Sequence, residues 1–110
     1  HCLEWYLDQH NVSNLPDSPA TINKLIHMLW DDFRPLAKEI HLCDFNPCRG
    51  GSHGRNLPLG KGVFPVEEFS RTIRSSGWNG IITPEIAPQY LRNIEQLKRL
   101  REQMHRLFPD

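Results

Sequence analysis

The stretch IHLCDFNPCRGGSHGRNLPLGKGVFP, residues 40–65, joins a short apolar run to a long segment rich in glycine and proline. The apolar run carries His41 and Asp44 and is too short for a helix, so it predicts a β-strand over 39–45. The glycines and prolines that follow predict an irregular loop over 45–64, because neither residue type favours the interior of a helix or strand. Glycines in such a loop allow the backbone to approach a ligand closely.

Strand and helix signals alternate on either side of this stretch. Short apolar runs predict strands over 3–8 and 81–86. Apolar residues at helical spacing predict helices over 21–34, 65–76 and 88–107. Strands and helices that alternate in this way are typical of parallel sheets with right-handed crossovers. We therefore expect one α/β domain, residues 1–110, with three consecutive βα units.

Individual residues predict where these elements begin and end. Pro65 is expected at the first position of its helix, where the missing N–H costs nothing. Gly77 is expected to end that helix in a left-handed conformation. Pro84 would give up a hydrogen bond inside a sheet, so strand pairing should end near it.

Composition excludes several classes of partner. The 110 residues carry 13 basic and 13 acidic side chains, so no field of one sign would attract a nucleic acid or an anionic membrane. No apolar run approaches the roughly 18 residues of a membrane span. The odd cysteine count, Cys2, Cys43 and Cys48, favours free thiols in a reducing, cytoplasmic compartment over a disulfide framework.

Polar side chains stand at the ends of all three expected strands. Asp8 and His10 end the first strand, His41 and Asp44 lie in the second, and Glu85 ends the third. In parallel α/β folds, ligands bind at the carboxyl ends of the strands. Because Asp, His and Glu together suit Mn, Mg, Zn or Co, these strand ends predict a shared divalent metal site.

The two segments IHLCDF and NLPLGKGVFPVEEFSRTIRSSGWNGIITPEIA resemble the closing part of the xylose isomerase-like TIM barrels. This superfamily of sugar isomerases and epimerases also contains endonuclease IV. The resemblance covers about residues 39–87 and depends on four features: His41-Leu42-Cys43-Asp44, Leu57-Pro58-Leu59-Gly60-Lys61-Gly62, Gly77-Trp78-Asn79-Gly80 and Glu85.

The resemblance implies a fold and a reaction. The fold would be a (β/α)8 barrel of roughly 250 residues, of which this chain would be a C-terminal fragment, completed by the rest of a barrel or by self-association. Asp8, His41 and Glu85 match metal-binding positions, and Glu85 matches a carboxylate that moves a proton beside a carbonyl. The reaction would be metal-assisted proton transfer, an isomerase or epimerase activity on a carbohydrate or polyol ketone. The expected partner is a small sugar or sugar phosphate.

Further residues are candidates for contacting that substrate. Arg49 and Arg55 in the loop could hold a hydroxyl, carboxylate or phosphate. The remaining candidates for substrate contact are Asp44, His10 and His53.

The sequence departs from the family pattern at the loop, where Asn56 occupies a position at which the family usually has His. This change leaves open a degenerate barrel without catalysis. A separate alternative is a small independent interaction module that alternates strands and helices. Endonuclease IV-like members need Asp-x-His in this loop, where the present chain has Gly54 and Asn56, so a phosphodiesterase is disfavoured.

Overall fold

The computed structural model describes residues 19–46 and 54–109. The chain divides into two compact units, His1–Ala37 and Lys38–Asp110, each of which is described by itself. In the first unit, helix α2 spans Pro19–Phe33 and buries Ile22, Ile26 and Trp30, which are four residues apart along one face. The strand expected over 3–8 lies outside the described residues.

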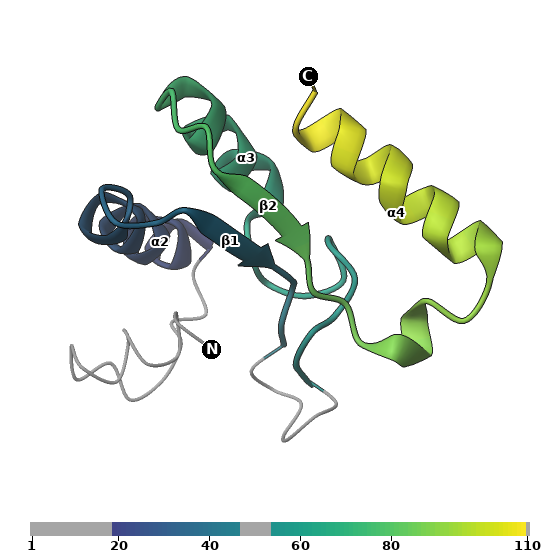
Figure 1. Ribbon diagram of the computed structural model, residues 1–110. Coiled ribbons are helices and arrows are strands. Elements are labelled where there is room, and N and C mark those ends of the chain that lie inside the picture. The colour runs from purple at the N-terminus through teal and green to yellow at the C-terminus, as the bar shows by residue number, and fades with distance from the viewer. Residues whose placement is uncertain (1–18, 47–53, 110) are drawn as a thin grey trace. The chain divides into compact units, whose positions relative to one another are not determined.

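The second unit contains a two-stranded parallel sheet (Figure 1). Strand β1 spans Glu39–Leu42 and pairs in register with β2, Ile81–Pro84, so that His41 lies opposite Thr83. The Glu85 N–H continues the pairing by donating to the Leu42 carbonyl at 2.8 Å. Pro84 is the last residue of β2, as its missing N–H predicts.

Both strands are shorter than predicted from the sequence. Strand β1 ends at Leu42 rather than at residue 45, and Asp44 instead forms an isolated antiparallel bridge with Leu57. The chain therefore leaves the sheet and pairs with its own loop, a long-range choice that local sequence does not reveal.

Helix α3, Val66–Ser75, connects the two strands and has the boundaries that its sequence signals predict to within one residue. Pro65 is the cap rather than the first helical residue, and Glu67 and Glu68 lie in the first turn, where the helix dipole favours anions. Val66, Phe69 and Ile73 are buried. Gly77 follows the helix with φ of 72°, the expected left-handed conformation.

The last helix differs from the expectation of one helix over 88–107. A short 3₁₀ helix, Pro88–Tyr90, comes first, and helix α4 then spans Ile94–Leu107. Leu91 leaves the helical region with φ of −128° and ψ of 39°. Asn93 restarts the helix by accepting a 2.9 Å hydrogen bond from the Gln96 N–H.

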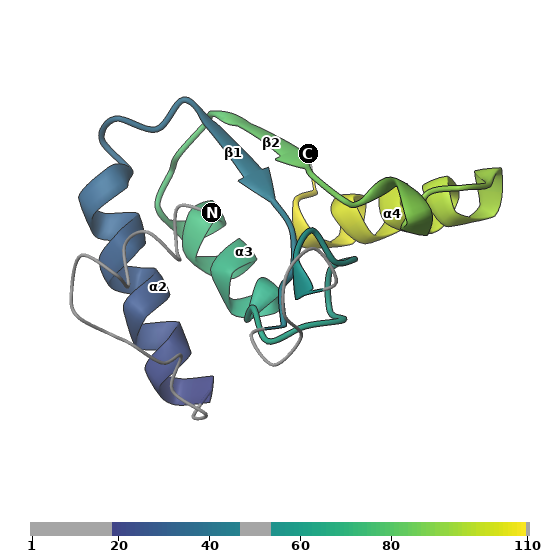
Figure 2. The same cartoon turned by 90° about the horizontal axis from the view of Figure 1, so that it is seen from below.

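The second unit is an α/β arrangement with its helices on one side of the sheet. Figure 2 shows α3 and α4 on the same side of β1 and β2. Strand β1, helix α3 and strand β2 form one βαβ unit, and α4 follows the second strand. The described residues thus include two of the three expected strands. Within the same residues, no helix combines the length and the apolar character that crossing a membrane requires.

Candidate functional site

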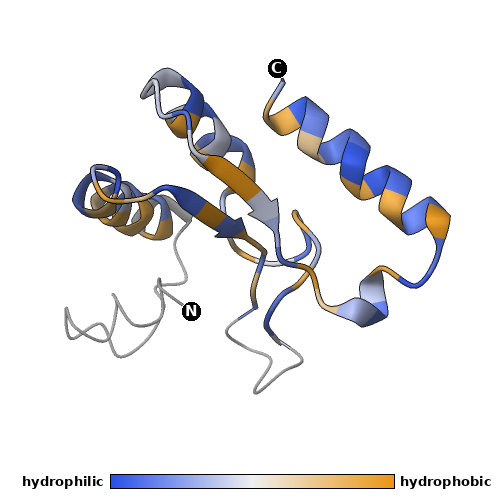
Figure 3. Ribbon diagram, in the orientation of Figure 1, coloured by the Kyte–Doolittle hydropathy of each residue, from blue (hydrophilic) through white to orange (hydrophobic). Residues whose placement is uncertain are grey.

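Side chains alternate between the two faces of the sheet, and the face that we call the polar face carries Glu39, His41 and Thr83 together with the exposed Ile81. On β1, Glu39 and His41 are exposed whereas Leu42 is only 3% exposed, and Figure 3 shows this alternation of polar and apolar residues. On β2, Thr83 lies on the same face as His41, its register partner. The polar face is therefore the one turned away from α3 and α4.

His41 and Glu85 meet on this polar face, although 44 positions separate them in the sequence. His41 Nδ1 lies 3.9 Å from Glu85 Oε2, and the two side chains are 54% and 48% exposed. The distance is too long for a hydrogen bond but short enough for both atoms to contact one bound group. Of the predicted ligands, the structure thus brings these two together, and Asp8 lies outside the described residues.

Glu39 is a member of the site that sequence reasoning missed. Its Oε1 lies 3.2 Å from His41 Nε2 and accepts a 2.8 Å hydrogen bond from the Thr83 hydroxyl. The available signal was the spacing of Glu39 and His41, two residues apart in a strand, which places both on one face. The resemblance to known barrels drew attention to His41 and not to its neighbour.

Asp44 takes a structural position in the fold. It is fully buried, and its carboxylate accepts hydrogen bonds from three backbone N–H groups, those of Phe45 and Phe64 to Oδ1 and that of Gly60 to Oδ2. These bonds fold the loop around the carboxylate. Its buried oxygens are thus satisfied by the backbone of the loop, and contact between Asp44 and a substrate stays a prediction.

Asn56 fixes the end of β2 relative to the loop. Its side-chain amide donates to the Glu85 carbonyl at 3.0 Å, and its own carbonyl accepts from the Ala87 N–H at 2.8 Å. Its φ of 52° is left-handed, a conformation that Asn tolerates better than most residues. The residue that departs from the family pattern thus holds the backbone that carries Glu85.

A hollow of about 590 Å³ opens beside Glu85. Arg55 and Asn56 line it from the loop, and the segment after β2 supplies the rest, Glu85, Ile86, Ala87, Pro88 and Gln89. Arg55 is exposed and lines this hollow together with Glu85, which makes it, within the described residues, the predicted substrate contact nearest that carboxylate along the hollow. Arg49, His10 and His53 lie outside the described residues.

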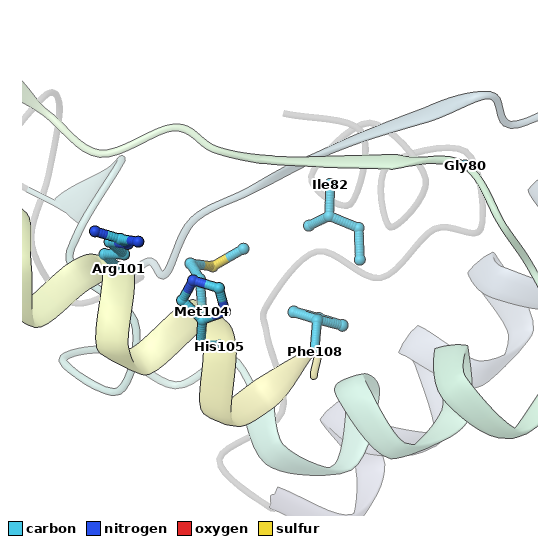
Figure 4. Close-up of a pocket in the computed structure, with 6 residues that line it drawn as sticks. All are labelled: Gly80, Ile82, Arg101, Met104, His105 and Phe108. Carbon is cyan, nitrogen blue, oxygen red and sulfur yellow. The ribbon is translucent and has the colours of Figure 1, made fainter. Parts of the chain in front are cut away.

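A second hollow, of about 320 Å³, lies between β2 and α4 on the opposite side of the sheet. Figure 4 shows Ile82 pointing from the strand toward Met104 of α4 and toward Phe108, the residue that follows this helix. This hollow faces the helices and is separate from His41 and Glu85.

Cys43 lies between the strand and the loop with an intermediate exposure and no disulfide. Burial raises the pKa of its thiol above the ordinary value. The protonated thiol is therefore favoured near neutral pH.

The metal site expected from the sequence stays a prediction. In the ranges 19–46 and 54–109, no three His, Cys, Asp or Glu side chains are close enough together to hold a metal ion. The pair formed by His41 and Glu85 supplies one nitrogen and one oxygen donor, which suit Zn, Mn or Co. Any complete ligand set needs at least one further donor besides this pair.

The sequence was compared with protein families and known proteins. Residues 4–107 match the family described as the xylose isomerase-like TIM barrel. The chain belongs to this family. No curated protein and no solved structure matches it. Membership in the family confirms the resemblance seen in the HLxD strand and the Gly77-to-Glu85 segment, and agrees with the parallel pairing of β1 and β2.

Proposed function

We propose that this xylose isomerase-like chain takes part in a sugar isomerase or epimerase, in which a divalent metal assists proton transfer on a carbohydrate or polyol ketone. The observation that carries the proposal is the approach of His41 Nδ1 to Glu85 Oε2 at 3.9 Å on the exposed polar face of the sheet. Family membership supports the reaction class by analogy.

The spacing of the two donor atoms suits a shared cation. Metal–nitrogen and metal–oxygen bonds to zinc are about 2.0–2.2 Å long, so two ligands of one ion lie at most about 4.3 Å apart. The observed 3.9 Å falls within this limit. Both side chains are about half exposed, which leaves a route for an ion to enter.

Two side chains would have separate roles in this reaction. Glu85 would accept and return the proton of a carbon next to a carbonyl, a role that a carboxylate close to its substrate can perform. Arg55, on the rim of the same hollow, would hold a substrate hydroxyl or phosphate. When bound, a divalent cation supplies electrostatic stabilisation of the negative charge that develops on the substrate oxygen.

A second candidate is a barrel of this family that has lost catalysis. The observation that favours it is Asn56, whose side chain is already engaged with the Glu85 carbonyl. A non-catalytic barrel would not need a metal, so metal binding separates the two candidates.

The test is metal titration of the intact protein. We expect Mn²⁺ or Co²⁺ to bind and to raise the melting temperature, because a ligand that binds only the folded state stabilises it. His41→Ala and Glu85→Gln should each weaken binding by at least about tenfold, since each removes a donor. The matched controls are His105→Ala and Glu95→Gln on α4, which remove an exposed histidine and an exposed carboxylate away from the polar face.

Activity is read as exchange of a substrate C–H for solvent deuterium beside the carbonyl of a ketose. Glu85→Gln should abolish the exchange even at saturating metal. If the protein binds none of Mn²⁺, Co²⁺, Zn²⁺ or Mg²⁺, or if His41→Ala binds as tightly as the parent, the metal-assisted reaction is ruled out in favour of the non-catalytic barrel.

A further inference from the structure

We infer that Glu39 is a positioning residue, which holds His41 as the tautomer with its proton on Nε2 and so leaves Nδ1 open toward Glu85. This inference rests on the proposed function, because it assigns a residue that would orient His41 toward a bound cation. Only the measurement of Mn²⁺ affinity depends on that function, whereas the NMR measurement of the tautomer does not.

The contacts of one oxygen atom support this assignment. Glu39 Oε1 lies 3.2 Å from His41 Nε2 and accepts the Thr83 hydroxyl hydrogen bond at 2.8 Å. Thr83 lies opposite His41 in the parallel register, so the strand pairing itself sets the place of the hydroxyl. Glu39 and His41 are two residues apart on β1 and share one face.

The chemistry of the carboxylate then selects the tautomer. An ionised carboxylate only accepts hydrogen bonds, so the ring nitrogen that faces it is favoured when it carries a proton. In a neutral imidazole the other nitrogen, Nδ1, then has a free lone pair.

The other ring nitrogen of His41, Nδ1, faces the carboxylate of Glu85 at a longer distance. His41 Nδ1 and Glu85 Oε2 are 3.9 Å apart, too far for a hydrogen bond between them. In the proposed tautomer, both atoms present lone pairs to the space between them. Histidine ligands of metals usually donate their other N–H to a carboxylate or carbonyl, which is the arrangement inferred for Glu39.

The first experiment reads the tautomer of His41 in the metal-free protein by ¹⁵N NMR of the histidine rings, with His41→Ala to assign the signals. We expect the parent to show protonated Nε2 and unprotonated Nδ1. Glu39→Ala should shift the population toward the Nδ1-protonated form. Glu39→Gln should keep the parent tautomer, because the amide oxygen still accepts a hydrogen bond.

A second variant guards against a folding defect in Glu39→Ala. Thr83→Val removes the hydroxyl that holds Glu39 while nearly preserving shape, and it should move the tautomer population in the same direction by a smaller amount. The control for loss of one negative charge is Glu95→Ala, whose carboxylate pairs with Arg99 on α4. This control should leave the His41 signals unchanged.

The second experiment measures Mn²⁺ affinity for the same variants. Glu39→Ala should bind about 10- to 100-fold more weakly, as is usual when the hydrogen-bond partner of a metal-binding histidine is removed. Glu39→Gln should recover most of that loss, and Glu95→Ala should bind as the parent does. A purely structural role for Glu39 would not give rescue by Gln together with a change of tautomer.

The outcomes separate this inference from the proposed function. If the parent binds no metal, the proposed function is wrong, yet the NMR signals still decide whether Glu39 sets the tautomer. The positioning role of Glu39 is overturned if His41 of the parent protein carries its proton on Nδ1. It is also overturned if Glu39→Ala changes neither the tautomer of His41 nor the affinity for Mn²⁺.

Discussion

Asp44 shows how a single buried carboxylate can organise a loop that has no regular secondary structure. Three backbone N–H groups point at its two oxygens, and the bridge to Leu57 ties the same residue into the returning chain. Gly62 completes the arrangement, because a Cβ at that position would collide with the Phe45 carbonyl and with Asp44 Oδ1. The loop beside the candidate site is therefore built on Asp44.

Removing this carboxylate should destabilise the protein strongly. We expect Asp44→Asn to lower the free energy of unfolding by about 1–3 kcal/mol, because an amide NH₂ replaces one acceptor and leaves a buried N–H unsatisfied. Asp44→Ala should cost about 3–5 kcal/mol, since all three N–H groups lose their partner. Urea unfolding measures both values, and a cost for Asp44→Ala below that of Asp44→Asn would contradict this account.

Cys43 should make stability depend on alkaline pH. Because burial raises the pKa of its thiol in the folded state, the unfolded chain ionises first as pH rises. The contribution of Cys43 is thus fully present below the ordinary thiol pKa of about 8.5 and is lost as pH rises through the folded-state value. The free energy of unfolding should fall less steeply between pH 8 and pH 10.5 in Cys43→Ala than in the parent. Equal slopes in the two proteins would exclude this effect.

At the scale of single elements, the C-terminal helix depends on its cap. Asn93 accepts the Gln96 N–H at 2.9 Å, and the Gln96 side chain accepts the Arg92 N–H at 2.7 Å. The first bond satisfies a donor of the first helical turn, and the second ties the residue before the cap to the same turn. They explain why α4 begins at residue 94 although apolar residues at helical spacing begin earlier.

Asn93→Ala should therefore cost about 1 kcal/mol of unfolding free energy, the usual value for a lost N-cap. The matched control is Asn79→Ala, an exposed asparagine in the turn before β2, which should change stability by less than about 0.5 kcal/mol. Chemical denaturation compares the two variants. A similar cost at both positions would show that the cap contributes nothing of its own.

The whole second unit is held together by contacts between elements that are distant in sequence. Arg106 of α4 pairs with Glu67 of α3 at 2.6 Å, and the Gln103 amide donates to the Leu59 carbonyl in the loop at 2.9 Å. Leu107 is almost fully buried, at 1% exposure, so an apolar contact accompanies these polar ones. The last helix is thus attached to both α3 and the loop.

The ion pair should contribute little despite its short distance. Arg106 and Glu67 are 58% and 57% exposed, so water and salt screen their attraction. A double-mutant cycle with Arg106→Ala and Glu67→Ala should give a coupling of about 0.2–1 kcal/mol that declines toward zero at about 1 M NaCl. A coupling above about 2 kcal/mol, or one that is insensitive to salt, would show that the pair is effectively buried.

Sequence reasoning predicted best those features that depend on backbone chemistry. The left-handed Gly77 and the pairing limit at Pro84 each follow from the conformational limits of one residue type. The family was also visible from the sequence, because the His41-to-Asp44 strand, the two glycine-containing motifs and Glu85 together resemble the family pattern.

Features that depend on long-range contacts could not be predicted in this way. Nothing in the sequence near Asp44 distinguishes a substrate contact from a carboxylate enclosed by residues 60 and 64. The helix expected from residue 88 failed for a local reason instead. Tyr90 and Leu91 fit a helical pattern, but the chain leaves the helical region at Leu91 and the helix restarts at the Asn93 cap. Glu39 was missed because its position beside His41 depends on a hydrogen bond from Thr83, which lies on the other strand.

The way Asp44 holds the loop has an evolutionary consequence. All of its hydrogen-bond donors are main-chain groups, so the loop keeps its path whatever side chains occupy positions 45 and 64, within the limits of packing. Position 60 is the exception, because its φ of 86° favours glycine. Exposed neighbours such as Arg55 and Lys61 are then open to substitution without refolding. What the loop recognises could then diversify while Asp44, Gly60 and Gly62 stay constant.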